Sequence, residues 1–303
     1  SSDTSNASPK GPLSSPRYDL AASSSQANAI TTPTLFPASS VRTGEIASQG
    51  FDTGYFGGGQ SEPGSYSTVD RIDYSNDTAT ASVKGPLSSP RYSLAATGNS
   101  NFGYFAGGDP GPKSTVDRID YSNDTPNASP KGPLSSPRYD LAATGNSNFG
   151  YFGGGKDPNT TATVDRIDYS CDTSDASPKG PLSSAKYVLA ATGNSNFGYF
   201  GGGSYWPGSY STVDRVDYSN DTPNASPKGP LSSARHVLAA TGNSNFGYFG
   251  GGSSGFAATA TVDRIDYSND TTNAVTKGPL SSARYYLAAT GNSNFGYFGG
   301  GGP

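Results

Sequence analysis

Short apolar stretches alternate with turn-forming residues along almost the whole chain. Within residues 91–134, apolar and aromatic positions gather at 92–97, 102–105, 115–121 and 128–134, and the third of these stretches alternates strictly between apolar and polar residues. Gly98-Asn99-Ser100-Asn101 separates the first two stretches and Gly107-Gly108 ends the second. Runs of this length between glycine- and asparagine-rich turns predict four short β-strands and no helix.

The four-strand pattern repeats through the chain. Val-Asp-Arg-(Ile/Val)-Asp-Tyr begins at Val69, Val116, Val164, Val213 and Val262, in steps of 47, 48, 49 and 49 residues. Gly-Tyr-Phe begins at Gly54, Gly103, Gly150, Gly198, Gly247 and Gly296. We therefore count six units. A single four-stranded unit of this size cannot bury both of its faces, so the period predicts blades packed around an axis as a β-propeller.

Residue types indicate how each blade is oriented. Pro130 and Pro133 fall in the fourth strand, and a proline inside a sheet is confined to an edge because it cannot donate to the ladder. The first strand reads Leu-Ala-Ala-Thr in most units, which is small enough to crowd near an axis. We expect the first strand to be innermost and the fourth to be outermost.

Composition supports an all-β fold and excludes several functions. The 303 residues include 41 glycines, 23 prolines and no methionine, which leaves little material for long helices. The net charge is −4 with no basic stripe, so a nucleic-acid partner is not expected. No apolar run is long enough to insert into a membrane, and the single cysteine, Cys171, excludes an internal disulfide framework.

The repeated wording resembles the kelch family. The carrying motifs are Tyr-Phe-Gly-Gly, then Val-Asp-Arg-Ile-Asp-Tyr, then Pro-Leu-Ser-Ser-Pro-Arg, over roughly residues 38–303. The chain departs from that family where Ala128 and its equivalents stand near the place of the usual fourth-strand tryptophan. The sequence of the repeats is also similar to that of kelch-like proteins of marine bacteriophage particles.

The closure of the ring is expected to involve both ends of the chain. Residues 284–303 supply only a first and a second strand, so we expect residues 18–37 to supply the third and fourth strands of the same blade. This gives one domain, 1–303, with a diverged closing segment at 1–41, repeats at 42–303 and six blades, seven being the alternative. Against this, residues 2–18 nearly copy residues 122–139, and the phase breaks after Ala22.

The units differ mainly in the loop between the second and third strands, at 60–66, 109–113, 156–162, 204–210 and 253–260. The resemblance implies that this loop shares a face with the fourth-to-first connection, and that the face binds partners beside a ring of basic residues. The candidate binding residues are Arg42, Arg91, Arg138, Lys186, Arg235 and Arg284, together with Tyr205, Trp206, Tyr210 and Phe256. The alternative is that the loop sequences vary without a role in binding, and that the basic residues pair with blade carboxylates.

Other motifs favour structural roles. Asp70 and Arg71, with their copies, are expected to form ion pairs within or between blades. The Asp73–Asp77 stretch has the alternating oxygens of a calcium loop but lacks its glycine and glutamate, so an Asx turn is favoured. His236 is the only histidine, and no Ser-His-Asp set can be composed around it.

These features predict a non-enzymatic binding or structural module without a cofactor. We expect an extracellular component of a phage virion surface or tail fibre, whose partners are other virion or surface proteins or a host glycan. A secreted or cell-surface lectin-like protein is the alternative.

Overall fold

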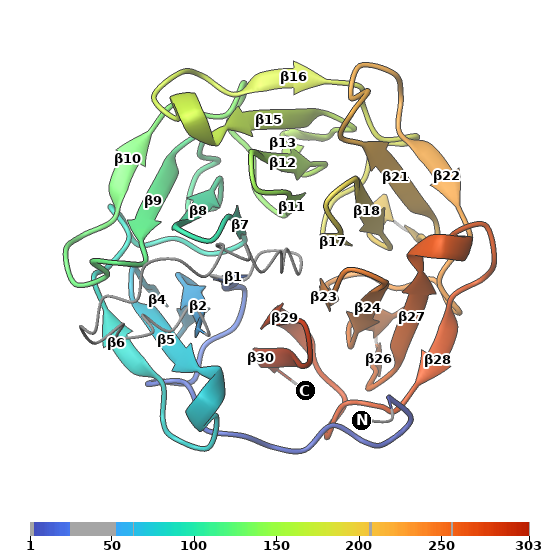
Figure 1. Ribbon diagram of the computed structural model, residues 1–303, viewed down its shortest axis with the longest axis horizontal. Coiled ribbons are helices and arrows are strands. Elements are labelled where there is room, and N and C mark those ends of the chain that lie inside the picture. Colours follow the sequence, from blue (N-terminus) through green and yellow to red (C-terminus); the bar gives the residue numbers. More distant parts are fainter. Residues whose placement is uncertain (1–2, 25–52, 63, 206–207, 256, 303) are drawn as a thin grey trace, which may run out of the picture.

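The sheets form a closed ring around a central axis (Figure 1). The computed structural model describes residues 3–24, 53–62, 64–205, 208–255 and 257–302. Five antiparallel four-stranded sheets stand side by side as blades, and each uses its strands in order from the axis to the rim. The fold is therefore a β-propeller. No helix in the described part of the chain is long and apolar enough to span a membrane.

Each blade contributes one strand to each of four layers. The innermost strands are β1 (Ala21–Ser24), β7 (Ala95–Gly98), β11 (Ala142–Gly145), β17 (Ala190–Gly193) and β23 (Ala239–Gly242). The second strands are β2 (Thr53–Gly57), β8 (Phe102–Ala106), β12 (Phe149–Gly153), β18 (Phe197–Gly201) and β24 (Phe246–Gly250). The third strands are β5 (Val69–Asp73), β9 (Val116–Asp120), β15 (Val164–Asp168), β21 (Val213–Asp217) and β27 (Val262–Asp266). The outermost strands are β6 (Ser82–Lys84), β10 (Ser129–Lys131), β16 (Ser177–Lys179), β22 (Ser226–Lys228) and β28 (Val275–Lys277).

A C-terminal hairpin and several short elements complete the described structure. The hairpin pairs β29 (Tyr285–Gly291) with β30 (Gly296–Gly302). The loops between second and third strands carry the small hairpins β3–β4 (Gln60–Ser61, Gly64–Ser65), β13–β14 (Lys156–Asp157, Asn159–Thr160), β19–β20 (Ser204–Tyr205, Gly208–Ser209) and β25–β26 (Ser253–Ser254, Ala257–Ala258). Single turns of 3-10 helix follow three of the third strands, namely η2 (Tyr74–Asn76), η3 (Tyr169–Cys171) and η4 (Tyr267–Asn269).

The expectation of six or seven four-stranded blades is wrong, because the described residues form five. A blade needs its own Val-Asp-Arg strand, and the sequence holds five of these against six Gly-Tyr-Phe strands. The hairpin β29–β30 takes the remaining place in the ring, between β23 and β1 (Figure 1).

The expected sharing of one blade by the two ends of the chain is also wrong. Of residues 18–37, the stretch Ala21–Ser24 forms β1, the innermost strand of the first blade, and pairs with β2 instead of with the hairpin. The rest of that segment, residues 25–37, lies outside the described residues. Residues 7–13 run along the rim outside the hairpin, where Ala7 N donates to Pro279 O at 2.9 Å and Ala81 N donates to Pro12 O at 2.9 Å.

The radial order of the strands is confirmed. Pro130 lies in β10, at the rim, and the small residues of the innermost strands line an axial cavity of about 70 Å³. Close packing between neighbouring blades explains the glycine that ends most second strands. A Cβ atom at Gly201 would stand 2.7 Å from the ring of Phe249 in the next blade.

The core lies between blades, and polar contacts cross the same seams. Tyr199 of one blade stacks on Tyr267 of the next at 4.8 Å between ring centroids. At the same seam Arg215 Nη1 lies 2.8 Å from Asp270 Oδ2. The corresponding pair Arg71–Asp124 spans 2.7 Å, and Asp70 pairs with Arg17, so the expected ion pairs of Asp70 and Arg71 are confirmed.

Candidate functional site: the axial mouth

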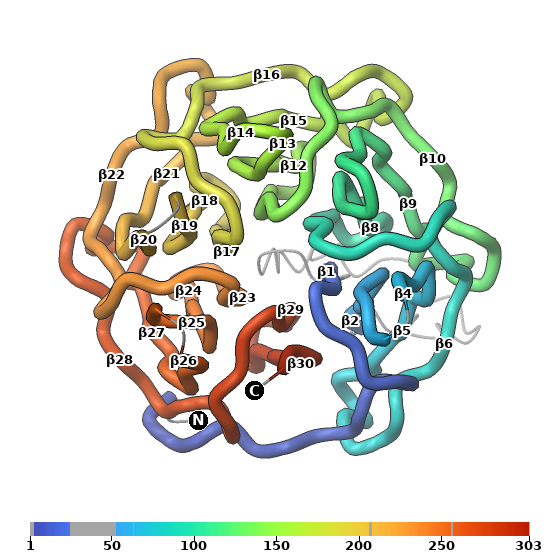
Figure 2. The backbone as a smooth tube through the Cα atoms, turned by 180° about the vertical axis from the view of Figure 1, so that it is seen from behind, coloured from blue at the N-terminus to red at the C-terminus, as the bar shows by residue number. Residues whose placement is uncertain are grey.

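The variable loops and the fourth-to-first connections emerge on one face of the ring, the face seen in Figure 2. In each complete blade, the residue after the basic residue pairs with the start of a variable loop. These bridges are Tyr18–Gln60, Tyr92–Asp109, Tyr139–Lys156, Tyr187–Ser204 and His236–Ser253. The backbone thus holds the loops beside the axis.

The predicted basic residues lie beneath this face instead of on it. The side chains of Arg91, Arg138, Lys186 and Arg235 are buried and pair with Asp117, Asp165, Asp214 and Asp263 at 2.7–2.9 Å. This is the pairing with blade carboxylates that the sequence left as the alternative. It gives these four side chains a structural role, and a role in binding stays a prediction.

The first and last basic positions differ from these four. Arg42 lies outside the described residues, and Arg17 takes the equivalent place in the first blade, paired with Asp70. The copy of residues 122–139 in residues 2–18 carried this signal, because it aligns Arg17 with Arg138. Arg284, in the hairpin, is half-buried and has no carboxylate partner among the described residues.

The predicted aromatic residues of the loops are only partly described. Tyr205 is 57% exposed, and Tyr210 is half-buried. Trp206 and Phe256 lie outside the described residues. The structure therefore brings one predicted aromatic ring to the surface, and its role in binding stays a prediction.

A closed circle of backbone hydrogen bonds surrounds the axis on this face. Six residues, one from each blade and one from the hairpin, each donate their amide to the next carbonyl oxygen at 2.8–3.1 Å. They are Asp19, Ser93, Asp140, Val188, Val237 and Tyr286, and all have φ between 49° and 57°. A positive φ is costly for residues other than glycine, above all for β-branched valine, and such strain is concentrated at functional sites. We call this circle and its neighbouring side chains the axial mouth.

Aromatic side chains ring the axial mouth. The residue before each member of the circle is Tyr18, Tyr92, Tyr139, Tyr187, His236 or Tyr285, and all six are partly exposed. Lys156 Nζ lies 5.3 Å from the centroid of the Tyr187 ring. Sequence reasoning missed these six residues, although their position in the repeat is aromatic in every unit. The residue that follows them differs between units more than almost any other position.

Two half-buried carboxyl groups, those of Asp19 and Asp140, lie in the circle. The pKa of Asp19 is raised to about 7, chiefly by burial. A hydrogen bond from Gln60 Nε2 at 2.8 Å opposes the shift, and the charge of Asp140 adds to it. Burial also raises the pKa of Asp140 to about 6. Such groups are partly protonated near neutral pH, so they can donate hydrogen bonds to a polar ligand and also accept them from it.

Two further motifs, around His236 and Asp73, make local contacts in the described structure. Ser209 Oγ lies 2.8 Å from His236 Nδ1, but no carboxylate in the described part of the chain contacts that ring. Asp73 Oδ1 accepts from Ser75 N at 2.9 Å, which is the favoured Asx turn. Across the described ranges, no three His, Cys, Asp or Glu residues gather as metal ligands.

No family model matches the chain, and no curated protein matches it either. The class of this protein, a β-propeller suited to binding or structural roles, therefore rests on its fold.

Proposed function

We propose that this chain is a non-enzymatic binding module that docks through the axial mouth and its variable loops on a neighbouring protein or a host glycan. The observation that carries the proposal is the grouping of sequence variation, aromatic rings and two half-buried carboxyl groups on one face of an otherwise repetitive ring. Aromatic faces beside hydrogen-bonding groups suit sugars and protein surfaces alike.

We further propose an extracellular location, on a virion surface or tail fibre of kelch-like type. Its support is the wording of the repeats, which resembles kelch-like proteins of phage particles. A secreted, lectin-like protein acting alone is the second candidate, and it is favoured by the ring of tyrosines at the axial mouth.

Two measurements test the proposal. Isolated protein is applied to a glycan array, and purified particles that contain the chain are imaged for ordered attachment. Tyr92→Ala and Tyr139→Ala should abolish whichever interaction is found. Val83→Ala, which removes an exposed side chain on the rim, is the matched control and should leave binding unchanged. Binding that survives both tyrosine substitutions would contradict the assignment of this face.

A further inference from the structure

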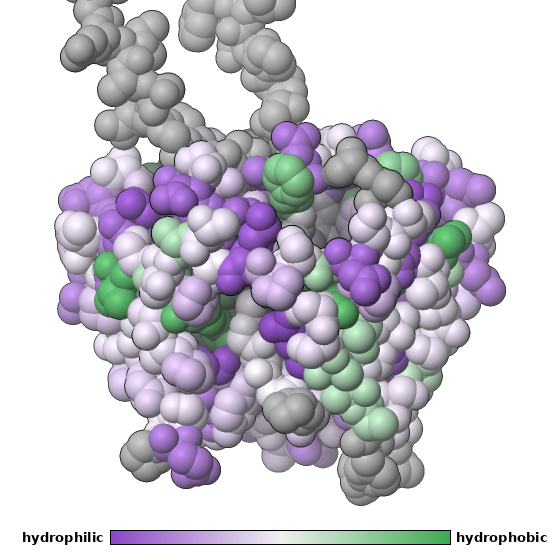
Figure 3. Space-filling view, turned by 90° about the horizontal axis from the view of Figure 1, so that it is seen from below, coloured by the Kyte–Doolittle hydropathy of each residue, from purple (hydrophilic) through white to green (hydrophobic). Residues whose placement is uncertain are grey.

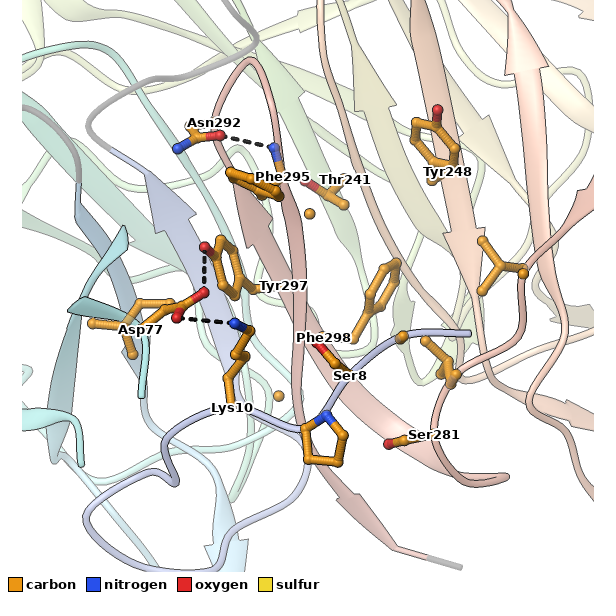
Figure 4. Close-up of a pocket in the computed structure, with 18 of the residues that line it drawn as sticks. Ser8, Lys10, Asp77, Thr241, Tyr248, Ser281, Asn292, Phe295, Tyr297 and Phe298 are labelled. Atoms are coloured by element: carbon orange, nitrogen blue, oxygen red, sulfur yellow. Dashed lines mark hydrogen bonds and ion pairs between the residues drawn. The ribbon is translucent and has the colours of Figure 1, made fainter. Parts of the chain in front are cut away.

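A groove of about 1190 Å³ lies between the hairpin and the rim segment 7–13 (Figure 4). β30 forms one wall, and Tyr248 and Phe246 of the neighbouring blade form another. Figure 3 views the molecule from this side, where hydrophilic and near-neutral residues cover most of the surface. Among the described residues, no strand pairs with the free edge of β30. In each complete blade, the third strand holds the corresponding edge.

The five third strands show what fits such an edge. Each reads Val-Asp-Arg-(Ile/Val)-Asp and is followed by tyrosine. Their acidic, basic and aromatic side chains each have a fixed receiving group in the ring. All three receiving groups recur at the groove.

The group that receives the first aspartate is Arg284. In every complete blade the equivalent basic residue pairs with the aspartate of the third strand, as Arg235 does with Asp263 at 2.7 Å. Arg284 Nη1 reaches only Gly300 O at 3.4 Å, and its Nη2 reaches Ser281 Oγ at 3.3 Å. Burial lowers the pKa of Arg284, and no carboxylate opposes that shift. A carboxylate brought into the groove would be well placed to pair with it.

The group that receives the arginine is formed by Phe295 and Asp77. In the neighbouring blade, the guanidinium of Arg264 lies 4.3 Å from the centroid of the Phe246 ring and pairs with Asp3 at 2.7 Å. The equivalent ring, Phe295, is 54% exposed. The equivalent carboxylate, Asp77, accepts from Tyr297 Oη at 3.0 Å and lies 3.2 Å from Lys10 Nζ, as Figure 4 shows.

The group that receives the tyrosine is formed by Tyr248 and Thr241. One blade earlier, the ring of Tyr267 stacks on Tyr199 at 4.8 Å, and its hydroxyl lies 3.1 Å from Thr192 Oγ1. Tyr248 and Thr241 hold the same two places beside the groove. In the described part of the chain, no aromatic ring stacks on Tyr248.

We propose that this groove binds an extended polypeptide strand with the pattern apolar-Asp-Arg-apolar-Asp-Tyr. The strand adds to the edge of β30 in the antiparallel register of the complete blades, with its aspartate opposite Phe298 and its arginine opposite Tyr297. The five Val-Asp-Arg segments at 69–73, 116–120, 164–168, 213–217 and 262–266 already lie in blades, so the occupant is a further strand that carries the same pattern. Main-chain hydrogen bonds provide affinity, and Arg284 with Asp77 provides specificity.

The test uses the whole protein and a fluorescent peptide, Thr-Val-Asp-Arg-Ile-Asp-Tyr-Ser, followed by anisotropy. The peptide is expected to bind, and a scrambled peptide of the same composition is not. Replacing the first aspartate of the peptide by alanine, or Arg284→Ala in the protein, should each weaken binding by at least about tenfold. Combining the two changes should weaken it little further, because both remove the same pair. Val83→Ala is the control and should bind as the parent does.

Three results would overturn the proposal. The first is equal binding of the scrambled peptide. The second is no saturation of the parent peptide below about 1 mM. The third is a protein that dimerises without peptide and becomes monomeric on Arg284→Ala, since the occupant would then be a second copy of this chain. The peptide variants keep the test valid even if Arg284→Ala disturbs folding.

Discussion

The hairpin β29–β30 and the inner half of the neighbouring blade have the same sequence but different environments. Residues 238–250 and 287–299 are identical. Phe249 is fully buried in the blade, whereas Phe298 is partly exposed in the hairpin. The difference lies in the third strand, which covers β24 and has no described counterpart on β30. Burial in this propeller is thus conferred by neighbouring strands, and identical segments should differ in their contribution to stability.

The largest difference in stability is expected between the equivalent arginines Arg235 and Arg284. Arg235→Ala leaves Asp263 buried without its counter-charge and should lower the free energy of unfolding by about 4 kcal/mol. Arg284→Ala removes a half-buried group with no carboxylate partner in the described structure, and should cost below about 1 kcal/mol. Urea denaturation of both variants measures the contrast. Equal losses would refute it.

The next largest difference in stability is expected between the equivalent phenylalanines Phe249 and Phe298. Phe249→Ala opens a cavity between two blades and should cost about 3 kcal/mol. Phe298→Ala should cost about 1 kcal/mol, because part of the ring is already exposed and the site can relax. The same denaturation experiment applies, with the parent chain as reference. A larger loss at Phe298 would mean that its ring is covered.

A third difference is expected in the pH dependence at the axial mouth. Asp19 bonds through its amide to Tyr286 of the hairpin, whereas Asp140 bonds to Ser93 of a complete blade. Both folded pKa values, about 7 and about 6, lie above the ordinary value of 3.8. The folded state therefore holds a proton that the unfolded state has lost, and stability falls as pH rises from about 4 to the folded pKa.

Substitution of each carboxyl group measures this effect. Relative to the parent, Asp19→Asn should gain about 3 kcal/mol of stability between pH 4.5 and pH 8, and Asp140→Asn should gain less. Asp266→Asn is the control, because hydrogen bonds from Ser268 lower the pKa of that exposed group. A flat difference between Asp19→Asn and the parent would contradict the raised pKa.

The smallest difference in stability is expected between the equivalent tyrosines Tyr199 and Tyr297. Tyr199 Oη donates to Asp270 at 2.9 Å inside a buried seam, and Tyr199→Phe should cost about 1 kcal/mol. Tyr297 Oη donates to Asp77 at 3.0 Å in a partly exposed site, and Tyr297→Phe should cost about half as much. Thermal unfolding followed in parallel resolves the order. The reverse order would indicate a seam at the hairpin as closed as the others.

Much of the fold could be predicted from the sequence, because local patterns determine it. The strands, their radial order and the ion pairs of Asp70 and Arg71 follow from period, proline placement and charge. The number of blades could not be predicted by counting Gly-Tyr-Phe motifs, because a blade requires a third strand and the hairpin lacks one among the described residues. Residues 17–24 were misplaced because the sequence between them and Thr53 interrupts the first unit.

The candidate site was less predictable than the fold. The sequence left open whether Arg91 and its equivalents bind a partner or pair with blade carboxylates, and only the folded ring shows the buried ion pairs. Burial raises the pKa values of Asp19 and Asp140, which lie in a circle of backbone hydrogen bonds that joins all parts of the ring. Such a circle depends on closure, and no single unit encodes it.

Hydrogen exchange resolved to single amides tests the central claim, that β27 covers the outer edge of β24 whereas no strand of the described residues covers that of β30. The account predicts that alternate amides within 296–299 exchange many times faster than their equivalents within 247–250, since among the described strands only β24 has a third strand on that edge. Equal protection of the two identical segments would contradict it.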